Sequence, residues 1–287
     1  MSVQLSFGYL PMRVFVPKHL CWRPDIPDFR DLVPESREIL KLFPDAKYPS
    51  VELPDTVDLS EYLLAYSTAL SPAACPSSVV CTKLVEYFDY RCTGKIEARC
   101  APFVTQAVTT LSRGDCSGIR ANLKAIRKFG LPAMSIAGCR SASNELYSGK
   151  ILVGTGDEYR SMHYIRLGDP GSAASPVPAL KSWLACGFPI AFGFSVPSSL
   201  DRDGYIDFRP TLDSIQGGHA ALLAGYDDQQ LAASRGAFRV YCPWGNDWGE
   251  QGFGWLPYTF VERRVALDFW TIIKPEWAHS GELFRSA

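Results

Sequence analysis

The sequence lacks a charge excess, a long apolar run and an internal repeat. Its 287 residues carry a formal net charge of -1, so no electrostatic field draws the chain toward nucleic acid or an anionic membrane. Nowhere do about 18 apolar residues follow one another without a charge or a breaker, so no membrane span is expected. Hydrophobic residues make up 47% of the chain, which is enough to bury the core of one large domain or two small ones.

Recognisable cofactor and metal motifs are also missing. No two cysteines or histidines have a zinc-binding spacing, and the phosphate-loop and dinucleotide fingerprints are absent. We therefore expect no cofactor and no metal. The start of the chain has no basic leader before an unbroken apolar run, because Pro11 and Arg13 interrupt it. These features predict a soluble, cytoplasmic protein that binds neither nucleic acid nor membrane.

Cysteine occurs nine times, which is an odd number. In a reducing cytoplasm, most of these thiols are expected to be buried and to pack as small apolar side chains. Only one or two of them are then expected to take part in chemistry.

Composition divides the chain into an N-terminal segment and a globular body. Residues 1–54 are rich in proline and charge, and the run at 23–31 reads RPDIPDFRD, which predicts an extended segment that packs on the body. The body is expected over 55–287. A helical lobe at about 55–135 and a β-rich lobe at about 136–287 give a two-lobed α+β fold class with a cleft between the lobes.

A helix is expected to begin next to Cys75. Pro76 suits the first helical position, and apolar residues follow it at helical spacing as far as Phe88. Cys75 then lies at or beside the helix N-cap. A second helix is expected at 117–129, ended by Gly130. Further elements are a helix at 177–186 and strands at 188–194, 220–226 and 237–241.

His219 has an unusual setting among the four histidines. Gly217 and Gly218 precede it and an apolar strand follows. Small neighbours at a strand start would leave this histidine exposed where a substrate can approach closely. A hydrogen-bonded structural histidine is the alternative.

Three stretches carry motifs of a known family. Residues 242–255 read CPWGNDWGEQGFGW, and they follow a strand that starts with His219. Residues 115–118 read DCSG, and residues 53–59 read LPDTVDL. Together with the run at 23–31, these stretches resemble the papain-like cysteine peptidase family, in a bacterial branch without the long inhibitory propeptide. The resemblance implies the papain-like fold, with a helical lobe, a β-rich lobe and a catalytic cleft.

The family works by nucleophilic catalysis, in which a thiolate at a helix N-terminus is paired with an imidazolium. The resemblance implies that His219 is the catalytic histidine and that Trp244 shields it. It also implies substrate contacts at Gly118 and Gly218. Cys242 stands where the family has the asparagine that orients the histidine, and a thiol is a weaker hydrogen-bond partner.

The nucleophile can be aligned in two registers. Counted without gaps from the preceding motif, the catalytic position falls on Cys75 and the oxyanion glutamine on Ala69. Aligned on the first cysteine, it falls on Ser78 and the glutamine on Pro72, and this register implies a disulfide between Cys75 and Cys116. We favour Cys75, because a sulfur at a helix start should be stabilised as thiolate by the unpaired N–H groups.

The sequence therefore predicts a thiol-dependent enzyme that acts on a peptide or acyl substrate. Peptide hydrolysis is the reaction that the resemblance implies. The missing oxyanion glutamine weakens that expectation, since losing one such donor typically costs about 100- to 1000-fold in rate. A repurposed transfer or cyclisation on an activated ester or thioester needs less help. The alternative is a catalytically inactive pseudopeptidase whose cleft serves as a binding groove or scaffold.

Overall fold

The structure is a computed structural model of the chain. It describes residues 15, 17, 19–44, 46, 53–64, 74–112, 115–135, 158–168, 171, 173–207, 209–231 and 235–279. Ala69 and Pro72, the two positions predicted for the oxyanion glutamine, lie outside these residues.

The helical lobe is built around the long helix α3 (Pro76–Thr93). Pro76 occupies its first turn, and Gly94 ends it in the left-handed conformation with a φ of 65°. Buried side chains lie on nearly all sides of α3, so it forms the core of the lobe rather than its surface. The helices that pack against it are α2 (Glu61–Leu64), α4 (Ala101–Leu111), α5 (Ile119–Phe129) and α8 (Pro275–His279).

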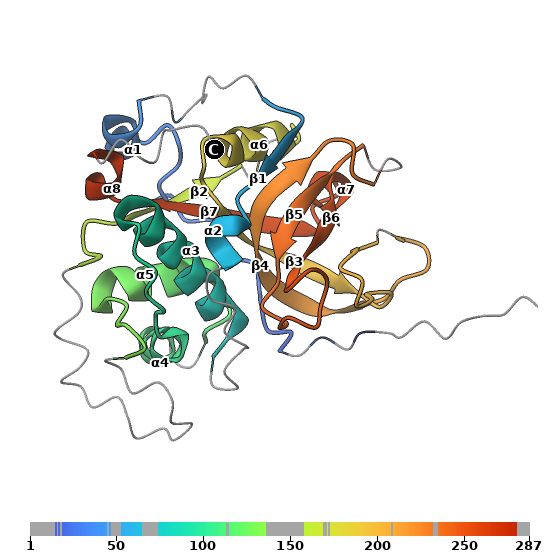
Figure 1. The fold of residues 1–287 in the computed structure, drawn as a ribbon, viewed down its shortest axis with the longest axis horizontal. Helices are drawn as coiled ribbons and strands as arrows, with labels where there is room; N and C mark the ends of the chain where they lie inside the picture. Colours follow the sequence, from blue (N-terminus) through green and yellow to red (C-terminus); the bar gives the residue numbers. More distant parts are fainter. Residues whose placement is uncertain are drawn as a thin grey trace, which may run out of the picture.

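The β-rich lobe is an antiparallel sheet with the hydrogen-bonded order β2-β7-β3-β4-β5-β6, in which β1 also pairs with β4. Its strands are β1 (Thr56–Asp58), β2 (His163–Leu167), β3 (Ile190–Pro197), β4 (Ile215–Asp227), β5 (Ala237–Tyr241), β6 (Phe253–Pro257) and β7 (Ala266–Ile273). The long strand β4 lies inside the sheet and contacts α3 of the helical lobe. This contact sets the boundary between the lobes, with helices α3 to α5 on one side and the sheet on the other (Figure 1).

Three shorter helices complete the described structure. They are α1 (Arg37–Leu42) in the N-terminal segment, α6 (Val177–Ala185) against β4, and α7 (Tyr258–Glu262) between β6 and β7. The expected α+β fold, with the helical lobe preceding most of the sheet, is confirmed. One boundary differs in a way that matters for the site. Strand β4 begins at Ile215 rather than at residue 220, because the backbone at Gly217 and Gly218 also pairs with β3.

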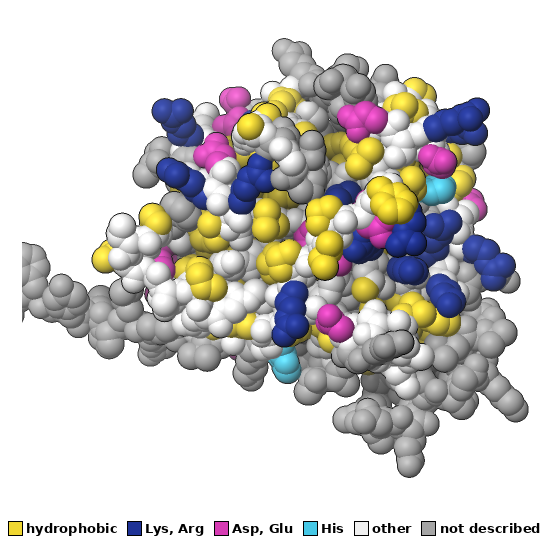
Figure 2. All heavy atoms as spheres, turned by 180° about the vertical axis from the view of Figure 1, so that it is seen from behind, with side chains coloured by type: hydrophobic (Ala, Val, Ile, Leu, Met, Phe, Trp, Pro, Cys, Tyr) yellow, Lys and Arg dark blue, Asp and Glu magenta, His cyan; other side chains and the backbone are white. Residues whose placement is uncertain are grey.

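The surface shows no dominance of one charge on the face that Figure 2 presents. Basic and acidic side chains are interspersed there with hydrophobic ones. This agrees with a formal net charge of -1 over the whole chain. Within the described ranges, no helix is both long enough and apolar enough to cross a membrane.

Candidate active site

Cys75 is the N-cap residue of α3 and is buried, with 6% of its surface exposed. Its backbone N–H donates to Thr105 Oγ1 at 3.0 Å, and its Sγ donates to the carbonyl oxygen of Cys116 at 3.2 Å. Cys75 and Cys116 are both thiols. The disulfide that the alternative register implies is therefore not formed in this structure.

The pKa of Cys75 does not follow the expectation for a sulfur at a helix N-terminus. The contact with Cys116 lowers it, but the contact with Cys21 and burial outweigh that effect and raise the pKa of Cys75 to about 11. The contact with Cys21 is the larger of the two raising effects, and burial adds to it because a sulfur covered by protein loses the water that would solvate its thiolate. In this conformation Cys75 is therefore a protonated thiol near neutral pH.

His219 lies within β4 and is fully buried, which corrects the expectation of an exposed histidine at a strand start. The two glycines before it do leave room, but Leu20 and Trp22 of the N-terminal segment fill that room. Among the described residues, neither ring nitrogen of His219 has a hydrogen-bond partner. Burial lowers the pKa of His219 to about 3, and the nearby backbone of His19 offsets only part of this.

Trp244 stacks on His219, with ring centroids 4.5 Å apart and an interplanar angle of 30°. This contact is the one that the predicted shielding role requires. Cys242, two residues before Trp244 in the sequence, is fully buried, and burial raises the pKa of its thiol well above the usual value. No hydrogen bond joins Cys242 to His219 in the described structure, since the imidazole nitrogens make none there. Among the residues that the structure describes, no side chain orients the histidine through a hydrogen bond.

Ser78, the alternative nucleophile, belongs to the first turn of α3 and is fully buried against α5. Its Oγ donates to Asn122 Oδ1 at 2.6 Å. The Asn122 amide in turn donates to the carbonyl oxygens of Cys116 and Gly118, at 2.9 and 2.7 Å. Ser78 therefore helps to fix the turn at Gly118, where the resemblance implies a substrate contact.

The N-terminal segment occupies the place between Cys75 and β4. Cys21 Sγ lies 3.5 Å from Cys75 Sγ. The backbone N–H of Trp22 donates to the carbonyl oxygen of Gly218 at 3.0 Å. The Trp22 indole lies so close to Gly193 and Gly218 that a Cβ added at either glycine would collide with it. The segment thus contacts both lobes and covers the two predicted catalytic residues.

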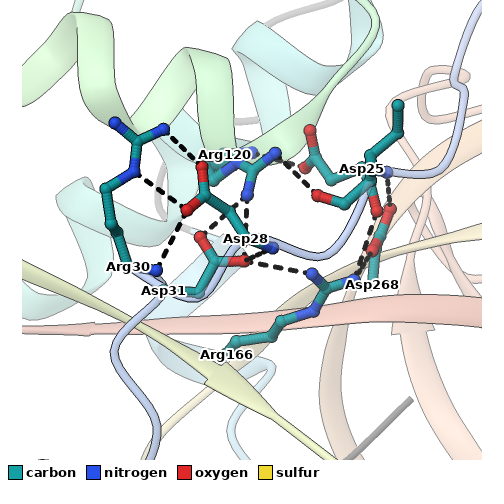
Figure 3. A network of polar contacts seen from close by, with 8 residues as sticks. Asp25, Asp28, Arg30, Asp31, Arg120, Arg166 and Asp268 are labelled. Carbon is teal, nitrogen blue, oxygen red and sulfur yellow. Dashed lines mark hydrogen bonds and ion pairs between the residues drawn. The ribbon is translucent and has the colours of Figure 1, made fainter. Parts of the chain in front are cut away.

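A network of ion pairs anchors the same segment further along the chain (Figure 3). Arg120 of α5 donates to both carboxylate oxygens of Asp31 at 2.9 Å, and its backbone N–H donates to Asp25 at 2.8 Å. Arg166 of β2 bridges Asp31 at 3.1 Å and Asp268 at 2.7 Å. The Asp25 backbone N–H also donates to Asp268, and burial raises the pKa of Asp268 to about 6.

The network makes a prediction about stability. Changing Asp31→Asn should lower the free energy of unfolding by about 3 kcal/mol, because it leaves Arg166, largely buried, without one of its carboxylates. The matched control is Asp28→Asn, in the same segment, whose partner Arg30 is 76% exposed and whose loss should have no measurable effect. Denaturant unfolding of both variants compares them. Equal midpoints for the two variants would show that the network does not hold the segment.

A cavity of about 500 Å³ lies beside this network and not at Cys75 or His219. Its lining includes Pro24 and Asp25 of the segment and Asp268 of β7. Cys21 and Trp22 instead fill the space between the predicted nucleophile and β4. In the part of the chain that the structure describes, no cluster of three or more His, Cys, Asp or Glu side chains could hold a metal ion.

The covering residues Cys21 and Trp22 are not among the site residues predicted from the sequence. A signal was present, because a tryptophan beside a cysteine in a proline-rich, charged segment needs a buried site to pack in. From the sequence, the small size of Gly217 and Gly218 predicts access for a substrate. In this structure the pair receives the chain's own Leu20 and Trp22.

Comparison with known proteins places this arrangement in context. No family model matches the chain. A stretch of 99 residues is 32% identical to an uncharacterized peptidase C1-like protein of Acanthamoeba polyphaga mimivirus, and the match spans 32% of this chain and 30% of that protein. Over 215 residues the chain is 23% identical to a cathepsin B-like protein of Giardia intestinalis, covering 73% of this chain and 71% of the relative.

A solved structure shows the same fold. The cysteine protease xylellain from Xylella fastidiosa superposes with a TM-score of 0.64 at 23% identity, covering 89% of this chain and 96% of that structure. The shared fold places a helical lobe against an antiparallel sheet, as described above. The chain therefore has the papain-like fold, and parts of its sequence are similar to a peptidase C1-like protein and to a cathepsin B-like protein.

Proposed function

We propose that this protein is a thiol-dependent hydrolase or acyltransferase that is latent in the conformation described above. Cys75 is its nucleophile and His219 its general acid and base. The observation that carries the proposal is the position of residues 20–22, which lie against Cys75 on one lobe and Gly218 on the other. A segment bound in this way occupies the place that a substrate needs.

Release of the segment would change the ionisation of both residues. Water would reach Cys75, whose pKa is now raised, and His219, whose pKa is now lowered. The N-terminus of α3 then favours the thiolate, and a charged imidazole nearby favours it further. Cys75 would attack the substrate carbonyl carbon, and His219 would protonate the leaving group.

The substrate class follows from what the site lacks. No hydrogen bond orients His219 among the described residues. An unoriented imidazole is a weak proton donor to the poor leaving group of a peptide. An activated ester or thioester has a better leaving group, so the proposal favours such acyl substrates over unactivated peptides.

A specific observation supports a second candidate. Both His219 nitrogens are buried without a partner in the described structure, and Cys242, which the sequence resemblance aligns with the orienting asparagine, is fully buried. A pseudopeptidase that keeps the cleft as a binding groove would show the same features. In that case the N-terminal segment would be a permanent part of the fold.

Turnover by an uncovered variant separates the two candidates. Trp22→Gly should hydrolyse an activated thioester or p-nitrophenyl ester, and adding Cys75→Ala should remove that activity completely. Adding Ser78→Ala instead should leave most of it, because Ser78 serves the Asn122 contact. Activity that survives Cys75→Ala but not Ser78→Ala would move the nucleophile to Ser78. No turnover in any uncovered variant would support the pseudopeptidase.

A further inference from the structure

A second thiol lies against the proposed nucleophile. Cys21 Sγ is 3.5 Å from Cys75 Sγ, although the two residues are 54 positions apart in the sequence. Both are thiols, and Cys21 is only half-buried. The proposed chemistry uses Cys75 and gives Cys21 no part.

The surroundings hold Cys21 in this position from both sides. On one side Leu20 packs at Gly217, and on the other Trp22 is hydrogen-bonded to Gly218. Asp25 is fixed a few residues further on by the backbone N–H of Arg120. A disulfide has its sulfurs about 2.05 Å apart, so bonding Cys21 to Cys75 requires the sulfurs to approach by only about 1.5 Å.

The pKa values of the three neighbouring thiols, Cys21, Cys75 and Cys116, are shifted differently. The hydrogen bond with Cys75 lowers the pKa of Cys21. The contact with Cys75 has the opposite effect on Cys116, whose pKa it raises far above the usual value. The attacking species in disulfide exchange is the thiolate, so Cys21 is the thiol of this group that is prepared to react first.

The geometry points to a disulfide between Cys21 and Cys75, formed by exchange with a low-molecular-weight disulfide, that locks the N-terminal segment over the site. The Cys21 thiolate attacks one sulfur of the small disulfide RSSR, which forms a mixed disulfide and releases RS⁻. Cys75 then gives up its proton and attacks the Cys21 sulfur, which releases the second RS⁻. In total, two protein thiols are oxidised and one RSSR is reduced to two RSH.

The consequence of this disulfide rests on the proposed function, but its formation does not. While the bond exists, Cys75 has no thiol to act as a nucleophile, and the segment cannot leave the cleft. Reduction restores both the thiol and the freedom of the segment to move. The pair would thus couple the availability of the nucleophile to the thiol–disulfide balance of the surroundings.

Peptide mapping of the full chain tests this directly. The protein is equilibrated with oxidised glutathione, quenched in acid, blocked with N-ethylmaleimide, digested, and examined by mass spectrometry. We expect a Cys21–Cys75 cross-linked peptide as the main product, reversed by dithiothreitol. Cys21→Ser should abolish the cross-link and leave Cys75 as a thiol. The matched control Cys92→Ser, which changes a half-buried cysteine of α3 away from the site, should leave it intact.

Other products would overturn the inference. A Cys75–Cys116 cross-link in the wild type would show that Cys75 forms its disulfide with Cys116 and not with Cys21. A lasting glutathione adduct on Cys21 without a cross-link would show that Cys75 does not complete the exchange. The ester assay on the reduced Trp22→Gly protein keeps the two proposals apart. A cross-link in a protein without turnover supports the disulfide and contradicts the proposed enzymatic activity. Turnover without a cross-link supports the activity and contradicts the disulfide.

Discussion

Changing Trp22→Gly will raise the rate at which iodoacetamide alkylates Cys75 at pH 7 on the order of 100-fold. In the covered protein the pKa of Cys75 is about 11, so only on the order of one molecule in 10,000 carries the thiolate at pH 7. Cysteines at helix N-termini beside an imidazolium have a pKa of about 7 or less, which makes the thiolate a major species.

Two further effects set the size of the change. A thiolate of lower pKa is intrinsically less nucleophilic, with a Brønsted coefficient of about 0.4–0.5, so part of the several-thousand-fold gain in thiolate is lost. Removing the indole also opens access to a side chain that is now only 6% exposed, which adds to the gain. The net increase is therefore still large. Mass spectrometry of the Cys75 peptide over time measures it.

Two further variants test whether loss of the cover over Cys75 causes the faster alkylation. Phe29→Gly removes an aromatic ring from the same segment, but that side chain is 99% exposed and its loss should leave the alkylation rate unchanged. Gly193→Ala acts from the opposite wall, because its new Cβ would collide with the Trp22 indole. It should accelerate alkylation in the same direction. If Phe29→Gly accelerates the reaction as much as Trp22→Gly does, the cover is not specific to residues 20–22.

Lowering the pH from 6.5 to 4.5 will open the cover more often in an Asp268→Asn variant, by up to about 100-fold, and much less in the wild type. The pKa of His219 is about 3 under the cover, below the ordinary value of 6.5. The covered state therefore binds fewer protons than the open state. The free energy that favours the covered state over the open state therefore decreases as the pH falls from 6.5 to 3, by about 1.4 kcal/mol per pH unit.

Asp268 acts in the opposite direction. Burial raises its pKa from 3.8 to about 6, so the covered state binds more protons at this group than the open state. That contribution favours the cover as the pH falls from 6 toward 3.8. Burial also raises the pKa of Asp25, which acts in the same direction. Because these windows overlap that of His219, the wild type should respond weakly, and Asp268→Asn should expose the histidine's effect.

Amide hydrogen exchange at Trp22 measures the opening, since this N–H is bonded to the Gly218 carbonyl only while the segment is in place. Rates are normalised to the intrinsic exchange rate at each pH. Adding His219→Ala to Asp268→Asn should remove the pH dependence. A protection factor for Trp22 that stays constant between pH 6.5 and 4.5 in Asp268→Asn would show that His219 is not uncovered when the segment moves.

The fold was predictable from the sequence because its determinants are local. Pro76 marks the start of α3, and the run of tryptophans and glycines at 244–255 marks the turn between β5 and β6. The helix near residue 117 was placed two residues early, because its N-cap is Gly118 and Ser117 lies before the cap. Such errors arise where several residues can begin a helix equally well.

The state of the site could not be predicted in the same way. The raised pKa of Cys75 and the lowered pKa of His219 both arise from burial beneath residues 20–22, which lie far away in sequence. No local pattern states where an extended segment will bind. The sequence indicated that residues 23–31 are extended, but not that Asp25 and Asp31 would bind Arg120 and Arg166.

The most direct test of the account is the pH profile of Cys75 alkylation in Trp22→Gly, with and without His219→Ala. The account predicts that Cys75 reacts well below pH 7 when His219 is present, because the imidazolium stabilises the thiolate. With His219→Ala, the profile should shift to higher pH, toward that of an ordinary thiol, whose midpoint lies at about pH 8.5. Identical profiles for the two proteins would contradict a thiolate–imidazolium pair and leave a papain-like protein whose cleft binds without catalysing.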